Sequence, residues 1–235
     1  EWVGSIPEKL LLWSEPDDKH WAPHYVLHKT LMGLYDMYAL AGSELALGIA
    51  GRFAAWFHRW TGQLSREQMD DKLDVETGAM LEVWADLYGA TGDQKYLDLI
   101  ERYTRSRLFD PLLDGQDMLT NQHANTTIPE IHGAARAYEV TGDERWRRIV
   151  EAYWGCAVTK RGMFCTGGQT SYEAWTPPFE FAAKLGDRNQ EHCTVYNMIR
   201  LADYLYRWTG DATYADYIER NLYNGILAQQ HPRTG

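Results

Sequence analysis

The sequence predicts an all-α protein built from helical hairpins, and a repeated turn is the main evidence. In four segments a Tyr is followed four residues later by a Gly, at Gly42, Gly92, Gly142 and Gly210. Apolar residues on both sides of these turns recur at the spacing of an amphipathic helix. Gly suits the left-handed position that ends a helix, and the Ser or Asp after it suits the N-cap of the next helix. Each turn therefore joins two helices.

The turns place a first and a second helix in every hairpin. The predicted first helices cover residues 24–40, 78–90, 129–140 and 194–208, with Pro129 expected at a first helical position. The predicted second helices run from Ser43 to about residue 60 and over 94–106, 144–157 and 212–227. Residues 1–23 are predicted to be an extended entry segment with one helical turn at 8–13. We expect residues 61–75, 107–128 and 158–192 to be non-helical.

Repeated helical hairpins form either an open solenoid or a closed toroid. The glycines of the turns lie 50, 50 and 68 residues apart, so the repeat is not uniform. This variation, together with the long segments between hairpins, favours the toroid, whose loops gather at one rim around a cavity. Four hairpins do not close a ring of six, so we predict an incomplete (α/α)6 toroid.

Composition excludes some partners. The net charge of −10 over 235 residues gives no basic footprint for nucleic acid or an anionic membrane, and neither partner is expected. The sequence has no 18-residue apolar run and no basic N-terminal region, so we expect no membrane span and no signal peptide. Three cysteines imply no disulfide framework and are compatible with the cytoplasm. The 10 Trp and 15 Tyr either pack helices together or offer flat faces to sugars.

The last interval, with its 18 additional residues, carries the residues that could do chemistry. Glu191 and Cys193 lie two residues apart at a predicted helix start, where the helix dipole favours a carboxylate or thiolate. This spacing can place an oxygen and a sulfur on one metal ion, and a thiolate prefers Zn²⁺ to Mg²⁺ or Ca²⁺. The alternative is a helix-capping Glu beside a buried Cys.

Glu173 is a candidate general acid. It follows Gly167-Gly168 and is flanked by Tyr172 and Trp175, which are neighbours that can raise a carboxyl pKa. The alternative is an exposed loop Glu with no catalytic role.

Several histidines are candidate hydrogen-bond donors to a polyol. They are His123, within an Asn- and Gln-rich segment, and the trio His20, His24 and His28. Taken singly, each of them is equally compatible with a structural role. The sequence has no Gly-rich phosphate loop, nucleophile elbow or dinucleotide fingerprint.

Several motifs together resemble the β-L-arabinofuranosidase glycoside hydrolases of family 127 and the related family 146. They extend in order over essentially the whole chain. The motifs are Trp21-Ala22-Pro23-His24-Tyr25, Asn121-Gln122-His123-Ala124-Asn125, Gly167-Gly168 with Glu173, Glu191-His192-Cys193-Thr194, and Asn221-Leu222-Tyr223-Asn224.

This resemblance implies that residues 1–235 are part of an (α/α)6 catalytic domain, with further hairpins before them and β-sandwich domains after them. It implies hydrolysis of terminal L-arabinofuranosides with retention, on a carbohydrate substrate. The family holds Zn²⁺ with one Glu and three Cys, and one of these cysteines is the nucleophile. By motif, Glu191 and Cys193 match two zinc ligands and Glu173 matches the acid/base. His123 matches a sugar-contacting residue, and we also expect substrate contacts from His28 and Glu76.

One part of the family pattern lies outside the sequence. The adjacent cysteine pair that includes the nucleophile is expected a few tens of residues after Gln229, whereas the chain stops at Gly235. Cys156 and Cys165 do not match this pair. Two other readings stay open: another toroid enzyme on sugars, such as an epimerase or unsaturated-uronide hydrolase, and a helical scaffold without activity.

Overall fold

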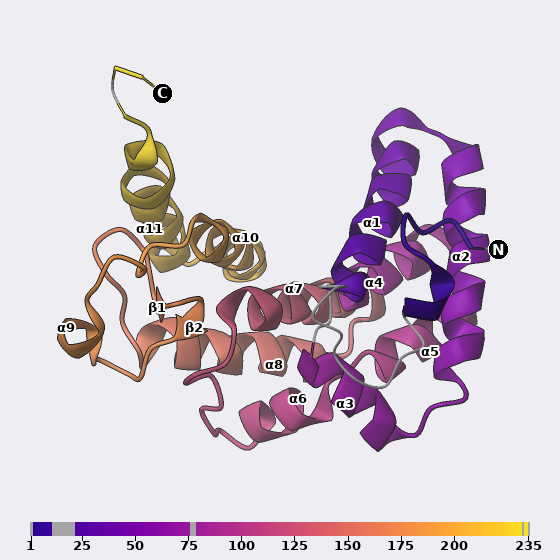
Figure 1. Ribbon diagram of the computed structural model, residues 1–235, viewed down its shortest axis with the longest axis horizontal. Helices are drawn as coiled ribbons and strands as arrows, with labels where there is room; N and C mark the ends of the chain where they lie inside the picture. The colour runs from indigo at the N-terminus through magenta and orange to yellow at the C-terminus, as the bar shows by residue number, and fades with distance from the viewer. Residues whose placement is uncertain (1, 11–21, 76–78, 232, 235) are drawn as a thin grey trace. The chain divides into compact units, whose positions relative to one another are not determined.

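The computed structural model describes residues 2–10, 22–75, 79–231 and 233–234. Within them the structure is mostly α-helical, and the sheet consists of two strands of two residues each (Figure 1). The predicted all-α class is therefore confirmed. By their contacts, the residues form two compact units, Glu1–Phe109 with Arg136–Glu144, and Asp110–Ala135 with Arg145–Gly235. No helix in the described part of the chain has the length and apolar character needed to cross a bilayer.

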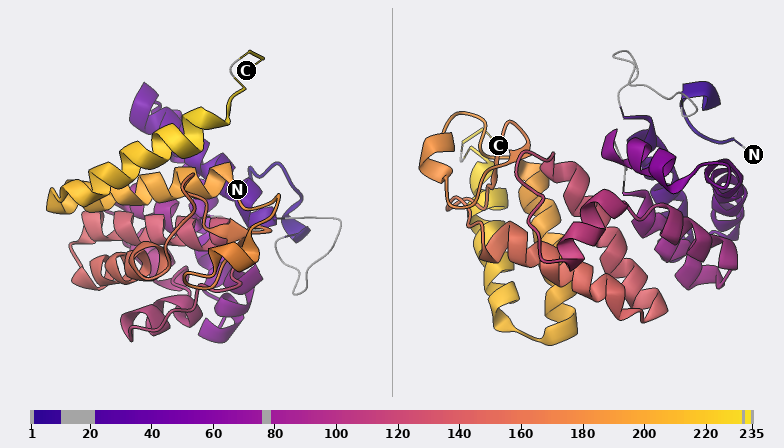
Figure 2. Two further views of the ribbon diagram at one scale, coloured as in Figure 1. Left: turned by 90° about the vertical axis from the view of Figure 1, so that its left-hand side faces the viewer. Right: turned by 90° about the horizontal axis from the view of Figure 1, so that it is seen from below.

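All four predicted hairpins are present. They pair α1 (Pro23–Ala41) with α2 (Glu44–Thr61), α4 (Met80–Thr91) with α5 (Gln94–Arg102), α7 (Ala124–Thr141) with α8 (Glu144–Trp154), and α10 (His192–Thr209) with α11 (Ala212–Asn221). Figure 2 shows α10 and α11 side by side, as they are in Figure 1. Helix α8 continues into a π-helical turn at Gly155–Thr159, and α11 into another at Leu222–Ile226 followed by a 3-10 turn at Leu227–Gln229. A further 3-10 turn covers Glu8–Leu10.

The turns have the conformation that the sequence predicts. All four glycines are left-handed, with φ between 67° at Gly42 and 70° at Gly142. In the second turn the Asp93 side chain accepts a hydrogen bond from the backbone N–H of Lys95 at 3.0 Å. Ser43 caps α2 in the same way, because its hydroxyl accepts from Ala46 N at 3.3 Å. In these turns the Gly ends the first helix, and the side chain of the residue after it caps the second helix.

Two segments predicted to be non-helical contain helices, α3 (Arg66–Val75) and α6 (Ser106–Leu113). A short helix, α9 (Phe181–Lys184), lies in the third segment. Helix α3 was not predicted because its composition is mostly polar. Its apolar stripe is narrow and includes Met69 and Leu73, which are buried and four residues apart.

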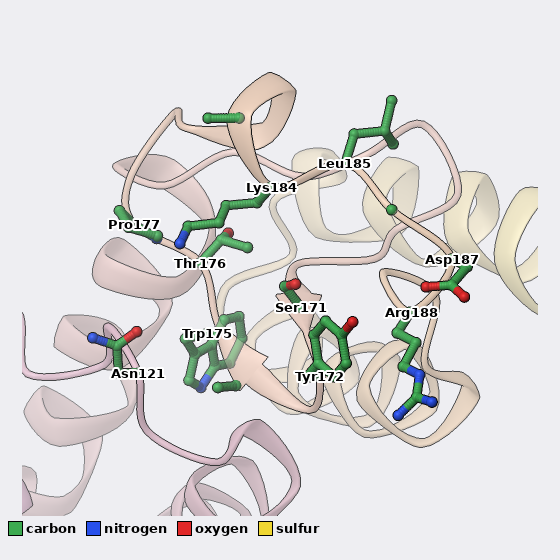
Figure 3. A pocket seen from close by; sticks show the side chains of 13 residues that line it. Asn121, Ser171, Tyr172, Trp175, Thr176, Pro177, Lys184, Leu185, Asp187 and Arg188 are labelled. Carbon is green, nitrogen blue, oxygen red and sulfur yellow. The ribbon is translucent and has the colours of Figure 1, made fainter.

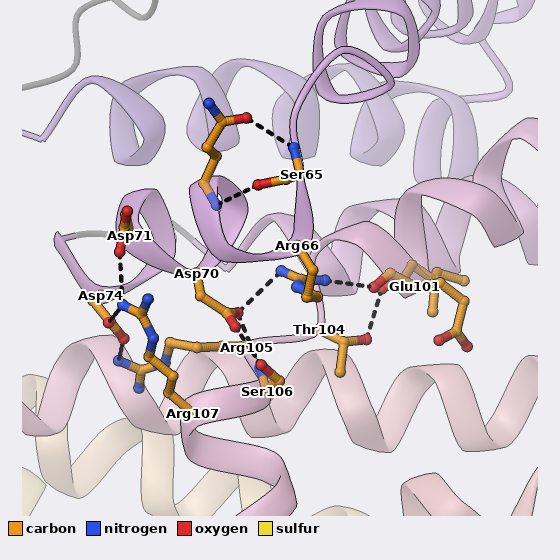
Figure 4. Close-up of polar contacts among 12 residues, drawn as sticks. Ser65, Arg66, Asp70, Asp71, Asp74, Glu101, Thr104, Arg105, Ser106 and Arg107 are labelled. Atoms are coloured by element: carbon orange, nitrogen blue, oxygen red, sulfur yellow. Dashed lines mark hydrogen bonds and ion pairs between the residues drawn. The ribbon is translucent and has the colours of Figure 1, made fainter.

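Polar contacts hold α3 in place (Figure 4). Ser65 and Gln68 exchange hydrogen bonds at the start of the helix, which is a capping box. Asp70 is 3% exposed, and it accepts from Arg66 at 3.1 Å and from the backbone N–H of Ser106 at 3.1 Å. The buried carboxylate is therefore satisfied by the segment that begins α6.

Helix α7 begins earlier than predicted. It starts at Ala124, so Pro129 lies inside the helix and not at its first position. The backbone N–H of Ala124 donates to the carbonyl of Glu173 at 2.9 Å, and this long-range bond fixes where the helix starts. Pro129 is the sixth helical residue, so only one hydrogen bond, to the carbonyl of Asn125, is lost.

Each unit has its own apolar core. In the first unit the buried residues include Leu27, Leu31, Phe53, Phe57, Trp84 and Leu99. The same unit contains a partly buried ion pair between Asp86 and Arg136 Nε at 2.6 Å. Burial raises the pKa of Asp86 to about 6, against the opposing effect of the Arg136 guanidinium. In the second unit the buried residues include Ile128, Ile131, Trp146, Tyr153, Trp175, Val195 and Met198.

Candidate active site

A tight β-hairpin in the second unit carries Glu173. Strand β1 (Thr170–Ser171) pairs antiparallel with β2 (Ala174–Trp175), and the turn between them has only two residues. Both turn residues are left-handed, with φ of 53° at Tyr172 and 69° at Glu173. When both residues of a two-residue hairpin turn have positive φ, as in a type I′ turn, Asn, Asp and Gly are the preferred residues. A Tyr and a Glu there are strained, and such strain concentrates at functional sites.

The rest of the hairpin is firmly anchored. Trp175 is 1% exposed, and its indole N–H donates to the Thr127 hydroxyl at 3.0 Å. The Trp175 ring also packs edge-on against Tyr153, with ring centroids 6.2 Å apart. The backbone of Asn121 donates to the Trp175 carbonyl at 3.0 Å. Segment 121–124 thus pairs with the hairpin as well, so the start of α7 and the turn are built as one piece.

The two glycines before the hairpin allow a close approach of backbone and side chain. Gly167 has φ of 80°, and a Cβ there would lie 2.4 Å from Asn221 Oδ1. At Gly168 a Cβ would lie 2.6 Å from the carbonyl oxygen of Asn189. No larger residue fits either position without movement. The Gly-Gly pair therefore lets the chain before the hairpin pass close to the end of α11, at Asn221, and to the segment that leads into α10, at Asn189.

The fold brings three predicted site residues together. His123 Nε2 lies 3.3 Å from Glu173 Oε2, and His123 Nδ1 lies 2.7 Å from the Thr126 hydroxyl. One donor atom each of His123, Glu173 and Glu191 lies within 4.8 Å of the others. If Thr126 donates to Nδ1, the ring proton is on Nε2 and points to Glu173. This cluster joins residues that are up to 68 positions apart in the sequence.

Glu191 does not cap α10, although it is the N-cap residue. Its side chain makes no capping hydrogen bond to the backbone. Instead Oε1 accepts from the Cys193 thiol at 3.1 Å, and Oε2 accepts from the Thr194 hydroxyl at 2.8 Å. The reading of Glu191 as a helix cap is therefore wrong. The Glu191 carboxylate contacts the sulfur of Cys193, the other candidate metal ligand of this motif.

The Cys193 thiol is harder to ionise than an ordinary cysteine. Burial, followed by the hydrogen bond to Glu191 and the negative charge of that carboxylate, raises its pKa to about 12. Backbone N–H groups at the helix start, those of Thr194 and Cys193, lower this pKa as expected, but burial and Glu191 outweigh them. A bound cation reverses this balance, since it attracts both the carboxylate and the sulfur. An oxygen and a sulfur donor this close together fit a zinc ion at two of its four positions.

The other predicted substrate contacts are in the first unit or outside the described residues. His28, on α1, is buried with 3% of its surface exposed. His24 is also buried, and its Nε2 lies 3.4 Å from the Tyr103 hydroxyl. Glu76 and His20 lie outside the described residues. The roles assigned to His28 and Glu76 stay predictions.

A pocket of about 460 Å³ opens beside the hairpin (Figure 3). Residues on both sides of Glu173, namely Tyr172 and Ala174, contribute to its wall. The end of α9 and the segment after it also line the pocket, with Lys184 and Arg188. The sequence argument identified neither of these cations. In the sequence they stand out only as part of a run of charged residues between the third and fourth turn glycines, Gly142 and Gly210.

A family model matches almost the whole chain. Residues 3–235 match the family model described as β-L-arabinofuranosidase, GH127 catalytic domain. The chain belongs to this family. Among curated proteins, no sequence matches the GH127 chain described here.

Three solved structures share the fold of this GH127 chain. One is a GH127 β-arabinofuranosidase, with a TM-score of 0.68 at 24% identity, over 88% of this chain and 33% of the other. One is a glycoside hydrolase, with a TM-score of 0.67 at 19% identity, over 93% of this chain and 41% of the other. The third is Ara127N, a GH127 β-L-arabinofuranosidase from Geobacillus stearothermophilus T6, with a TM-score of 0.62 at 19% identity, over 90% of this chain and 38% of the other.

At these levels of sequence identity, the three structures are evidence for the fold of the chain. They agree with the predicted incomplete (α/α)6 toroid. The chain spans only about a third to two fifths of the three matched structures.

Proposed function

We propose that this chain is part of the catalytic domain of a retaining glycoside hydrolase that removes terminal L-arabinofuranose from plant-type glycans or glycoproteins. The observation that carries the proposal is the convergence of His123, Glu173 and Glu191 within 4.8 Å in a GH127 chain. A glycosidase needs a carboxyl group at the leaving oxygen and a nucleophile on the other side of the anomeric carbon. The cluster supplies the carboxyl group, that of Glu173, and the nucleophile is assigned below.

Glu173 is the proposed acid/base. Its side chain is 66% exposed at the tip of the turn, so a glycosidic oxygen can reach it. As the bond from the anomeric carbon to that oxygen breaks, the Glu173 carboxyl gives its proton to the oxygen. In the second step the ionised Glu173 takes a proton from water while the water oxygen bonds to the anomeric carbon, and the bond from that carbon to the nucleophile breaks, which releases the sugar. His123 Nε2, at 3.3 Å, orients the carboxyl, and we assign the exposed imidazole ring a contact with the sugar.

Glu191 and Cys193 are the proposed zinc ligands of this chain, with two further cysteines expected beyond Gly235. Bound zinc keeps cysteine sulfur in the thiolate form at neutral pH. Without a cation, the surroundings of Cys193 favour the thiol, as the pKa of about 12 indicates. We propose that the nucleophile is one of the downstream cysteines, as the resemblance to the family implies.

The distance between the two carboxylates supports a second mechanism. An oxygen of Glu173 and an oxygen of Glu191 lie within 4.8 Å, close to the separation of about 5–5.5 Å found in ordinary retaining glycosidases. In this alternative Glu191 itself attacks the anomeric carbon. Its oxygens already accept hydrogen bonds from Cys193 and Thr194, which favours a holding role over an attacking one.

The test is to assay the full-length protein on p-nitrophenyl β-L-arabinofuranoside and to follow the first-formed sugar by NMR. We expect turnover with the β-anomer as the first product. No turnover, or an inverted product, would refute the proposal. A covalent intermediate trapped with a mechanism-based inhibitor and mapped by peptide mass separates the two mechanisms, because the label lies on a cysteine in the first and on Glu191 in the second.

A further inference from the structure

The pocket beside Glu173 is lined by two cationic side chains and one acidic side chain. Lys184 and Arg188 both line it, and among the described residues neither forms an ion pair with an Asp or Glu. Asp187 is the only acidic residue in the pocket wall. The pocket wall therefore carries a net positive charge, although the chain as a whole has a net charge of −10. A positive local charge in a chain of negative net charge favours an anionic ligand group at this place.

The arrangement of the wall suits a sugar ring that bears this anion. The Arg188 guanidinium lies over the Tyr172 ring, 5.0 Å from its centroid. The Tyr172 backbone N–H also donates to the Arg188 carbonyl at 3.1 Å, so the cation is tied to the hairpin turn. In Figure 3 the Tyr172 and Arg188 side chains lie together on one side of the pocket. Ser171 and Asn121 add a hydroxyl and an amide.

The position of the pocket indicates which part of the substrate it receives. Tyr172 and Ala174 line it and directly flank Glu173 in the chain. A general acid must contact the oxygen of the leaving group, so the sugar next to the scissile bond lies against this turn.

We propose that the pocket binds the leaving-group side of the glycan and selects a carboxylated sugar, a uronic acid. Lys184 and Arg188 are the specificity-determining residues, and Arg188 can meet a carboxylate with two parallel N–H donors. This inference rests on the proposed hydrolysis, because that reaction defines which side of Glu173 the leaving group occupies.

The test compares two disaccharides with the same linkage, β-L-arabinofuranose on galacturonic acid and β-L-arabinofuranose on galactose, in the full-length protein. We expect kcat/KM to be about tenfold higher for the acidic substrate in low salt, as two partly exposed cations can produce, and the difference to shrink in high salt. The double variant Lys184→Met/Arg188→Met keeps the aliphatic stems and should abolish the preference. Asp187→Asn removes the opposing charge and should increase it.

Lys160→Met is the matched control, since Lys160 is an exposed lysine of the same unit outside the pocket wall. It should keep the preference of the wild type. Equal kcat/KM for the two disaccharides, or a preference that the double variant retains, would overturn the inference while turnover of the nitrophenyl substrate leaves the proposed reaction standing.

A binding experiment decides the inference even if hydrolysis fails. Tri-galacturonate and the neutral galactose trisaccharide are titrated by NMR against wild type and variants. We expect the acidic trisaccharide to bind more tightly, and the double variant to raise its Kd by about tenfold or more. Equal affinities for both trisaccharides, or a Kd that the double variant leaves unchanged, contradict the proposed charge selection.

Discussion

His123 Nε2 lies 3.3 Å from Glu173 Oε2, although the two residues are 50 positions apart in the chain. The contact exists because segment 121–124 forms backbone hydrogen bonds with the hairpin that carries Glu173. The same pairing fixes the start of α7. Glu173, the proposed acid/base, and His123 are therefore positioned by backbone structure and do not depend on side-chain packing alone.

Replacing Glu173 with Gln should slow hydrolysis of a substrate with a poor leaving group by about 10²–10⁴-fold. Such a leaving group needs the proton that Gln cannot give. A p-nitrophenyl group needs little protonation, so its first chemical step should lose much less rate. Single-turnover kinetics on alkyl and p-nitrophenyl arabinofuranosides measure both. Glu180→Gln, at an exposed Glu of the same loop region, is the control; equal losses on both substrates would show that Glu173 is not the acid.

Replacing His123 with Ala should reduce kcat/KM by about 10–100-fold, since the carboxyl loses its orienting partner and the sugar loses a donor. His123→Asn restores one donor and should recover part of the loss. Thr126→Val removes the hydroxyl at 2.7 Å from Nδ1 and should produce a smaller defect of the same kind. Steady-state kinetics check the order of the three variants. Wild-type rates in His123→Ala would remove this residue from the site.

The full-length protein should contain about one zinc ion per chain, held in a tetrahedral site of thiolates and a carboxylate. Cys193→Ser and Glu191→Gln should each lower the zinc content measured by elemental analysis. Cys165→Ser is the control, because Cys165 is exposed and matches no ligand position. Zinc-free protein that is fully active, prepared without chelator, would contradict this prediction.

Gly168→Ala should destabilise the loop before the hairpin by about 1–3 kcal/mol, because the new Cβ would clash with the Asn189 carbonyl oxygen at 2.6 Å. That oxygen belongs to the backbone and has little room to move. Gly186→Ala is the matched control, since the nearest atom there is 3.9 Å away. Urea unfolding compares the two. If Gly168→Ala is as stable as Gly186→Ala, the close approach does not matter to the fold.

Asp86 should make stability depend on pH between about 4 and 7. Its folded pKa, raised to about 6, lies above the ordinary value of 3.8. The folded state therefore favours the protonated form, and this contribution is present below pH 4 and is lost as the pH rises through 6. The difference in free energy of unfolding between wild type and Asp86→Asn should thus fall across that range. A difference that stays constant with pH in urea titrations would show that Asp86 titrates normally.

The hairpins could be predicted from sequence because their signals are local. Each Gly with a positive φ and each N-cap, such as Asp93, acts within a few residues of itself. Helix α3 was missed since its stabilisation is partly remote, through the contact of Asp70 with Ser106. The start of α7 was missed for the same reason, because it depends on a hydrogen bond to Glu173.

The candidate site was predictable only in part. Glu173, Glu191 and Cys193 stood out through their neighbours and through resemblance to a family. Nothing local in the sequence indicates that Glu191 binds the Cys193 thiol and does not cap the helix, because that choice depends on side-chain direction and burial. The cations of the pocket wall were missed since a charged loop looks like any solvent-exposed loop until its partner surface is known.

The two-residue turn between β1 and β2 fixes the direction of both its side chains. We expect a deletion or an insertion in this turn to move the Glu173 carboxyl away from His123. The segment from Thr176 to Arg188, by contrast, contains the short helix α9, and most of its side chains are exposed. Substitutions at its exposed positions, such as Lys184, can change the charge of the pocket wall and leave the two-residue turn intact. The length of the turn at Tyr172 and Glu173 is therefore constrained by the position of the carboxyl, whereas the side chains that line the pocket a few residues later can change without altering that turn.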